Sequence, residues 1–303
     1  MAHGTKFVIY AALTGNALIS VTKFIAASIT GSAAMMAEGI HSLVDTGNQG
    51  LLLYGMKRAQ RPADERFPFG HGKEIYFWSF IVAILIFALG SGVSLYEGVH
   101  RTMHPEPVTD PLINYVVLAL ALVFEGAAWF FAWKEFRRSM HGRGVRETIH
   151  ASKDPTTFIV LFEDSAAMIG LVVAAVGLVL NQILDMPIFD GLASIGIGII
   201  LGLTAIMLAI RTKSLLIGES ADPALVADVR QRAGAIDAVV AVNEVLTLHM
   251  GPHDVLLTIS LDFRDDLTAG DMERAIEQLT RDIRSAHDDI KRVFVEAESQ
   301  KPT

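Results

Sequence analysis

The feature that most constrains the fold of this chain is a series of long apolar segments in its first two thirds. A helix that crosses a bilayer needs about 20 mostly apolar residues, and its backbone polar groups must all be bonded within the protein. The first segment lacks the basic end and the A-x-A site of a signal peptide, so we expect it to be a span. The sequence predicts an α-helical membrane protein whose domain 1–212 holds six transmembrane helices, at residues 7–29, 33–56, 76–99, 112–133, 157–181 and 188–210.

Basic residues lie almost entirely in alternate loops between these segments. The loops after the second, fourth and sixth segments are basic, whereas the other loops hold only Arg101. Because cytoplasmic loops carry an excess of Lys and Arg, we expect both termini in the cytoplasm and the chain in a bacterial inner membrane. The basic residues are Lys57, Arg58, Arg61, Arg66, Lys73, Lys134, Arg137, Arg138, Arg143, Arg146, Lys153, Arg211 and Lys213.

The last third, residues 213–303, is charged and mixed, which is typical of a small soluble domain. Asp222-Pro223 indicates a helix start, with a capping side chain followed by proline at the first helical position. The alternating segments VVAVNEVLTLH and DVLLTISLDF flank Gly251-Pro252 and predict two strands joined by a turn. Thr268 and Asp271 form a capping-box pattern for a second helix, and KRVFVEAE predicts a last strand. This order predicts a cytoplasmic α+β domain with a ferredoxin-like arrangement.

Composition limits the chemistry. The chain contains no cysteine, so it has no disulfide and no thiolate ligand, and any metal must be held by oxygen or imidazole. The formal net charge of −8 weighs against nucleic acid as a partner. No nucleophile or general-base motif is present, and we therefore expect no enzyme.

Ionisable residues interrupt the second and fifth apolar segments. His41 and Asp45 are four residues apart and share a helix face, and Glu163 and Asp164 lie within the fifth segment. An ionisable group inside a span costs at least ~2.5 kcal/mol, so such residues are functional by default. Imidazole and carboxylates suit Zn²⁺, or Mn²⁺, Fe²⁺ and Co²⁺. The same groups bind protons, so protons and metal compete for them.

Alternatives remain for this cluster and for other polar residues. The second-segment residues are also compatible with a structural hydrogen-bond cluster. Glu38 is expected to pair with Lys23, to cap a helix or to relay protons, and for both Glu38 and Glu125 an ion pair is favoured over a ligand role. In the tail, His249 and His253 are expected to be surface histidines rather than metal ligands.

The segments GNALISVTKF, GSAAMMAEGIHSLVD and FPFGHGKEIYFWS, with the plan of six spans and an α+β tail, resemble the cation diffusion facilitator family. This family consists of dimeric antiporters that exchange divalent metals for protons, and the resemblance covers nearly the whole chain. The segment DPTTFIVLFEDSAA is similar to the branch that contains the mitochondrial and nuclear-associated zinc carriers of animals. The resemblance implies a homodimer, held through the tail domain and the membrane helices.

The resemblance also implies a transport site with two ligands from span two and two from span five. His41 and Asp45 match the first pair, and Asp164 matches one member of the second. The other member falls at Val160, which cannot ligate. Glu163, Asn48, Glu125 or water is left as the fourth ligand, with Glu163 displaced by about 100° around the helix.

The resemblance implies further roles outside the spans. Asp64 and His71 match a second metal site in the loop after span two, where Phe67 replaces a further histidine. Glu296-Ala297-Glu298 replaces a His-x-Asp of the tail, so we expect no two-metal site there. Lys73 occupies the place of a lysine that pairs with an acid at the start of the tail, for which Glu219 is the nearest candidate.

Together these features predict an efflux transporter that exchanges a divalent cation, zinc first, for protons. Manganese, iron or cobalt is the alternative substrate. An ion channel and a metal sensor are the alternative functions.

Overall fold

The computed structural model describes residues 2–108, 110–140, 142 and 144–299. Internal contacts divide the chain into two compact units. The membrane unit comprises Met1–Met56, Phe77–Ile149 and Pro155–Thr212, and the tail unit comprises Lys57–Tyr76, His150–Asp154 and Lys213–Thr303. The segments Lys57–Tyr76 and His150–Asp154 thus make their contacts within the tail unit, and the predicted boundary at residue 212 stays a prediction.

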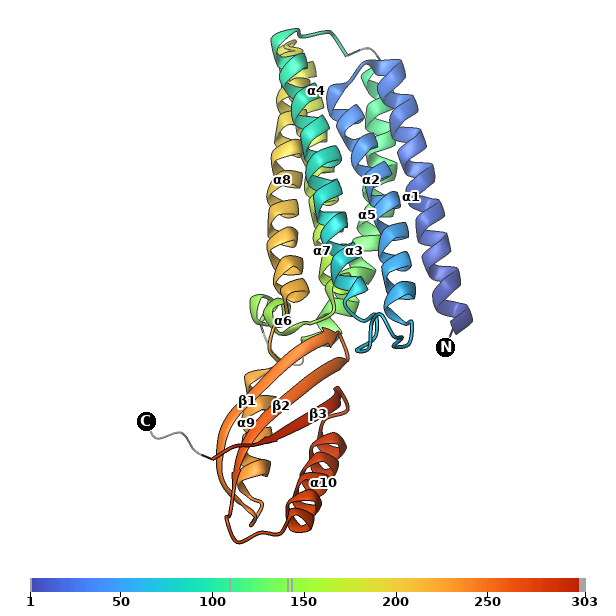
Figure 1. Ribbon diagram of the computed structural model, residues 1–303. Coiled ribbons are helices and arrows are strands. Elements are labelled where there is room, and N and C mark those ends of the chain that lie inside the picture. The colour runs from blue at the N-terminus through green and yellow to red at the C-terminus, as the bar shows by residue number, and fades with distance from the viewer. Residues whose placement is uncertain (1, 109, 141, 143, 300–303) are drawn as a thin grey trace. The chain divides into compact units, whose positions relative to one another are not determined.

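Long helices that lie side by side form the membrane unit (Figure 1). Five of the six predicted segments each lie within one of these helices, and the third lies within three consecutive helical elements. They are α1 (Ala2–Thr30), α2 (Ala33–Ala59), α3 (Glu74–Leu85) with η1 (Ile86–Ser91) and α4 (Gly92–Met103), α5 (Pro111–Ser139), α7 (Pro155–Leu184) and α8 (Ile188–Ile217), and α6 (Val145–Ala151) is a short helix between α5 and α7.

Four of these helices are long and apolar enough to cross a membrane, among the residues that the structure describes. They are Glu74–Met103, Pro111–Arg138, Phe158–Leu184 and Ile188–Ile217. The described part of α1 holds a shorter apolar helix, Asn16–Thr30, and α2 contains too many polar groups to qualify. The first two spans therefore stay predictions.

In the described part of α1, large apolar side chains lie outward and Lys23 lies inward. The exposed apolar side chains follow helical spacing, at Leu18, Val21, Ile25 and Ile29, whereas Lys23 is fully buried on the opposite face. This distribution is the inverse of that of a soluble helix, and it is what a lipid surface requires. Helix α2 is buried on more sides, and its buried residues include Glu38, His41, Asp45 and Asn48.

Small residues allow α8 to approach α4 and η1 closely. A Cβ on Gly98 would lie 2.6 Å from the backbone nitrogen of Ile195, so only glycine fits at this contact. The hydroxyls of Ser91 and Ser194 donate to the carbonyls of Gly198 and Ser94 at 2.7 and 2.9 Å. Close backbone approach and hydroxyl bonds of this kind hold membrane helices together, since lipid provides little hydrophobic force between them.

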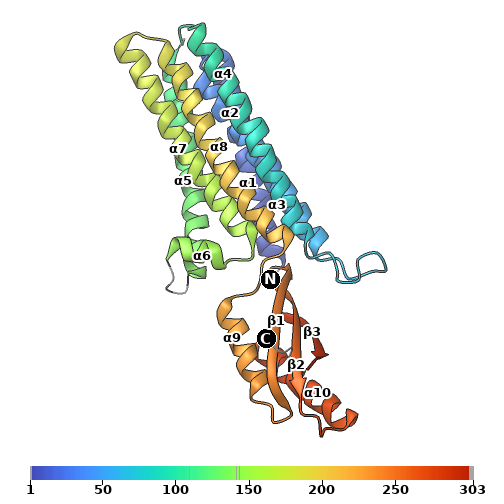
Figure 2. The same cartoon turned by 60° about the vertical axis from the view of Figure 1, so that its left-hand side comes forward.

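The tail domain has the predicted element order. Its elements are α9 (Pro223–Gly234), β1 (Val239–Gly251), β2 (Asp254–Phe263), α10 (Ala269–Ala286) and β3 (Ile290–Ala297). Strand β2 lies between β1, which is antiparallel to it, and β3, which is parallel (Figure 2). The predicted caps are confirmed: Asp222 accepts from the amide of Ala224 at 2.9 Å, and Thr268 with Asp271 forms the capping box.

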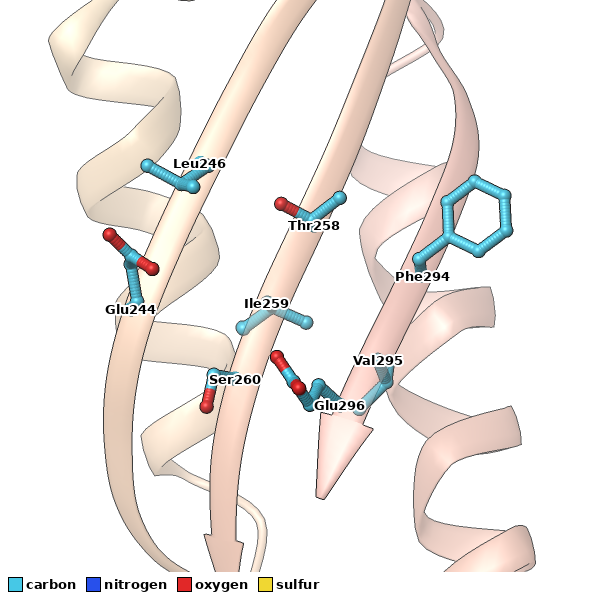
Figure 3. A pocket seen from close by; sticks show the side chains of 8 residues that line it. All are labelled: Glu244, Leu246, Thr258, Ile259, Ser260, Phe294, Val295 and Glu296. Atoms are coloured by element: carbon cyan, nitrogen blue, oxygen red, sulfur yellow. The ribbon is translucent and has the colours of Figure 1, made fainter. Parts of the chain in front are cut away.

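Both tail helices pack on one face of the sheet. Leu257, Ile259 and Leu261 of β2 form the core with Leu279 and Ile283 of α10, and α9 adds two further buried side chains. A hollow of about 210 Å³ is lined by residues of all three strands (Figure 3). Its lining includes Glu244, Ser260 and Glu296.

Candidate functional site

Helix α2 carries a continuous buried polar stripe. His41, Asp45 and Asn48 are polar, yet they are only 1, 5 and 0% exposed within the membrane unit. The Nε2 atom of His41 lies 3.5 Å from Oδ2 of Asp45, which confirms that these two residues share one helix face. The 3.6-residue helical period produces this arrangement directly from their spacing.

Helix α7 brings its two acids to this stripe. Asn48 donates from Nδ2 to Oε1 of Glu163 at 2.8 Å, across the interface between α2 and α7. Glu163 and Asp164 are both buried, at 4 and 7% exposure. The four predicted transport residues are thus all buried in the membrane unit, on two helices that Asn48 and Glu163 join, and we refer to them as the transport cluster.

Several atoms of this cluster lack a hydrogen-bond partner in the described part of the chain. They are both ring nitrogens of His41, Oδ1 of Asp45 and Oδ1 of Asn48. A buried polar atom without a partner costs about 1–3 kcal/mol, and most such atoms are satisfied by protein, water or an ion. A bound cation would satisfy the imidazole and carboxylate together, and these donor types fit a first-row divalent ion.

The described residues nevertheless contain no group of three or more His, Asp and Glu side chains arranged closely enough to hold a metal ion. Val160, one turn before Asp164, provides no ligand atom. Glu163 reaches α2 through Asn48 in spite of its displaced position on α7. The complete ligand set, including Glu163 as its fourth member, stays a prediction.

A second buried polar cluster lies next to the first. Lys23 of α1 contacts Glu38 of α2 at 3.0 Å and Glu125 of α5 at 3.3 Å. The expected pair of Lys23 with Glu38 is confirmed, and so is the preference for an ion pair at Glu125. Lys23 also donates to the hydroxyl of Ser42 at 2.7 Å, a contact that the sequence analysis missed.

Asp64 and His71 meet in the loop after α2, as the spacing suggested. Nε2 of His71 lies 2.9 Å from Oδ2 of Asp64, while Oδ1 of Asp64 accepts from the amides of Arg66 and Phe67 at 2.9 and 2.7 Å. Gly70 adopts a φ of 85°, which returns the chain so that the imidazole faces the carboxylate. A cation that bound both residues would have to replace the bond between them.

We expect Asp64 to titrate at unusually low pH. The hydrogen bond with His71 and that from the Phe67 amide hold its pKa below the ordinary value of about 3.9. A lowered folded-state pKa stabilises the loop above that ordinary value, and the contribution is lost as pH falls through the folded pKa. Carbon-detected NMR of the Asp64 carboxyl should show this, and His71→Ala should return the pKa toward its ordinary value. An unchanged titration in His71→Ala would contradict the role given to this bond.

Glu219 pairs with Lys153 at 2.5 Å, whereas its expected pairing with Lys73 stays a prediction. One expectation for the tail unit was wrong. His249 is not a surface residue: it is 5% exposed, its Nδ1 lies 3.2 Å from the carbonyl of Gly251, and burial lowers its pKa. The ring of His253, in contrast, is exposed as expected.

Residues 9–217 match the family described as the cation efflux transmembrane domain. The chain belongs to the cation diffusion facilitator family. The match covers most of the chain and includes the buried polar residues of α1, α2, α5 and α7 described above. The chain is therefore an integral membrane protein of this family, with a helical membrane domain and an α+β tail.

Named relatives of this cation diffusion facilitator occur in animals and plants. The "Proton-coupled zinc antiporter SLC30A9, mitochondrial" of Mus musculus is 35% identical over 262 residues, which are 86% of this chain and 46% of that protein. The "Metal tolerance protein C4" of Arabidopsis thaliana is 36% identical over 213 residues, covering 70% of this chain and 47% of that protein. The chain thus spans about half the length of the curated relatives it matches.

A solved structure also matches part of the chain. It is a nickel form of a MamM CTD variant, with 15% identity and a TM-score of 0.25, and the match covers 26% of this chain and 100% of that one. This likeness is too weak to carry an argument.

Proposed function

We propose that this chain transports a divalent cation, zinc first, across a membrane in exchange for protons. The observation that carries the proposal is the buried cluster of His41 and Asp45 with Glu163 and Asp164, in which the imidazole has no hydrogen-bond partner among the described residues. The name of the animal relative, a proton-coupled zinc antiporter, supports the same activity. Manganese, iron and cobalt remain alternative substrates because their ligand preferences overlap with those of zinc.

The exchange follows from the chemistry of the proposed ligands. A metal binds when the imidazole of His41 is neutral and the carboxylates are ionised, so each ion bound releases the protons that these groups held. When the site opens to the other side, protons displace the metal and return with the empty site. Differential access of one site to two compartments is sufficient for antiport, and no covalent step is required.

The proposal includes the setting of the transporter. We propose that residues 213–303 form a cytoplasmic domain that supports a homodimer together with the membrane helices, and that both termini are cytoplasmic. The excess of Lys and Arg in alternate loops supports this orientation. The bacterial inner membrane is the proposed location. The pair of Asp64 and His71 is the proposed second metal site, in the loop that follows α2.

Proton movement opposite to zinc is the expected result in proteoliposomes that contain a pH-sensitive dye. Zinc that enters the lumen should make the lumen alkaline, and an acidic lumen should accelerate zinc entry. A protonophore should abolish the acceleration, and vesicles with Asp45→Ala protein serve as the control for leakage. Zinc flux that ignores the pH gradient would contradict antiport and would favour a channel.

A further inference from the structure

Three oxygen atoms from two helices surround the ammonium group of Lys23 on α1. They are Oγ of Ser42 at 2.7 Å, Oε2 of Glu38 at 3.0 Å and Oε1 of Glu125 at 3.3 Å. The lysine side chain is 0% exposed, so solvent does not screen the positive charge of the ammonium group. The hydroxyl of Ser42 also lies 3.5 Å from Oε1 of Glu125, so the oxygen atoms around the ammonium group are in contact with one another.

The oxygens of Glu38, Ser42 and Glu125 around Lys23 form an oxygen cage, and the second carboxylate oxygen of Glu38 is left unbonded among the described residues. Oε1 of Glu38 is buried and has no hydrogen-bond partner in the described part of the chain. It lies against α7, where a Cβ on Gly170 would be 2.5 Å away, so a larger residue there would collide with the carboxylate. Two carboxylates share a single ammonium, and without that ammonium both would face each other in a buried site, where unpaired charge is very costly.

The donor types of the cage differ from those of the transport cluster. Two carboxylates and a hydroxyl offer only oxygen, which suits Mn²⁺, Mg²⁺ and Ca²⁺, whereas imidazole with carboxylates suits zinc. Ser42 directly follows His41 in α2, so the oxygen cage and the transport cluster use neighbouring positions of one helix. An oxygen-binding cation in the cage would place a divalent charge close to the transported ion.

We propose that Lys23 is a tethered cation that fills a second divalent-cation site and thereby keeps oxygen-preferring ions such as Mn²⁺ from binding at that position. The covalent tether keeps the ammonium permanently at the cage, so a free ion has to displace it. The role of Lys23 as a determinant of ion selectivity rests on the proposed transport function, but the existence of the latent site does not.

Mn²⁺ binding to the purified full chain tests this proposal. The Asp45→Ala protein, which lacks a proposed transport ligand, provides the background, and bound Mn²⁺ is counted by electron paramagnetic resonance. Adding Lys23→Met should raise the number of bound Mn²⁺ by one per chain and should make the Tm rise with Mn²⁺ concentration. Adding Glu38→Gln and Glu125→Gln to that protein should remove both effects, because the cage then has no charge.

The control variants separate a latent site from a purely structural ion pair. If Lys23→Met lowers the Tm and Mn²⁺ neither binds nor restores it, Lys23 only holds the helices together and the proposal is overturned. If Lys23→Met needs Mn²⁺ to fold, while the variant with both glutamines folds without it, the proposal is supported. Failure of zinc transport by the wild-type chain would overturn the proposed function but would leave the Mn²⁺ comparison intact, since its background lacks Asp45.

Discussion

Zinc flux in proteoliposomes is expected to fall at least ~100-fold when Asp45 or Asp164 is changed to alanine. Loss of a partner that only orients a metal ligand already costs about 10–100-fold in affinity or activity, and a carboxylate that binds the metal directly should cost more. Each substitution also removes one negative charge from a cluster that water barely reaches, where Asp45 and Asp164 are 5 and 7% exposed. Initial rates of zinc uptake, measured with a fluorescent chelator in the lumen, provide the comparison.

Glu97→Gln is the matched control for this loss. Glu97 is a partly exposed carboxylate of α4 that pairs with Arg101 at 3.3 Å. The Glu97→Gln protein should retain the wild-type rate of zinc uptake. This result would show that the loss of flux is not a general effect of removing an acidic side chain from the membrane unit. Wild-type uptake by either Asp45→Ala or Asp164→Ala protein would refute the assignment of the site.

Removal of the Asp190 carboxylate is expected to destabilise the membrane unit by about 3 kcal/mol. Asp190, at the start of α8, accepts from the hydroxyl of Ser32 at 2.5 Å and from the amides of Ala33 and Ala34, and so caps the N-terminus of α2 from another helix. The first amides of a helix have no partner within it, and loss of a cap costs up to ~2 kcal/mol. A hydrogen bond to a charged group adds ~1.5–3 kcal/mol.

Unfolding of Asp190→Ala in mixed micelles, followed by circular dichroism, measures this loss. Asp190→Asn keeps one oxygen acceptor in the same place, so it should lose only about 1 kcal/mol, the difference between a charged and a neutral hydrogen bond. An Asp190→Ala protein as stable as wild type would disprove the capping role. Equal loss in both variants would assign the effect to the negative charge rather than to the hydrogen bonds.

Local features of the fold were predictable because they depend on residues close together in the sequence. The capping box of Thr268 and Asp271 spans three residues, and the contact of His41 with Asp45 spans four. Helical period alone decides such arrangements. The extents of the membrane helices follow the apolar segments for the same reason, since a bilayer imposes one length and one backbone structure on them.

Contacts between distant residues were not predictable in the same way. Glu163 was placed out of register by helical geometry, yet Asn48 donates to it across 115 positions of sequence. The sequence offered Lys73 as a partner for Glu219 but did not indicate Lys153, which lies 2.5 Å from Glu219 in the structure. Charge complementarity identifies suitable partners, whereas packing selects among them.

The sequence by itself determined that this chain forms membrane helices with ionisable groups inside and a capped α+β domain at its end. Hydrophobic segments, helical period and capping patterns are local properties, and each has one physical solution. Only the tertiary structure decided that Asp190 caps α2 and that one ammonium group serves two glutamates and a serine from neighbouring helices. Those partners are chosen by the free energy of burying polar groups together, which depends on how whole helices pack.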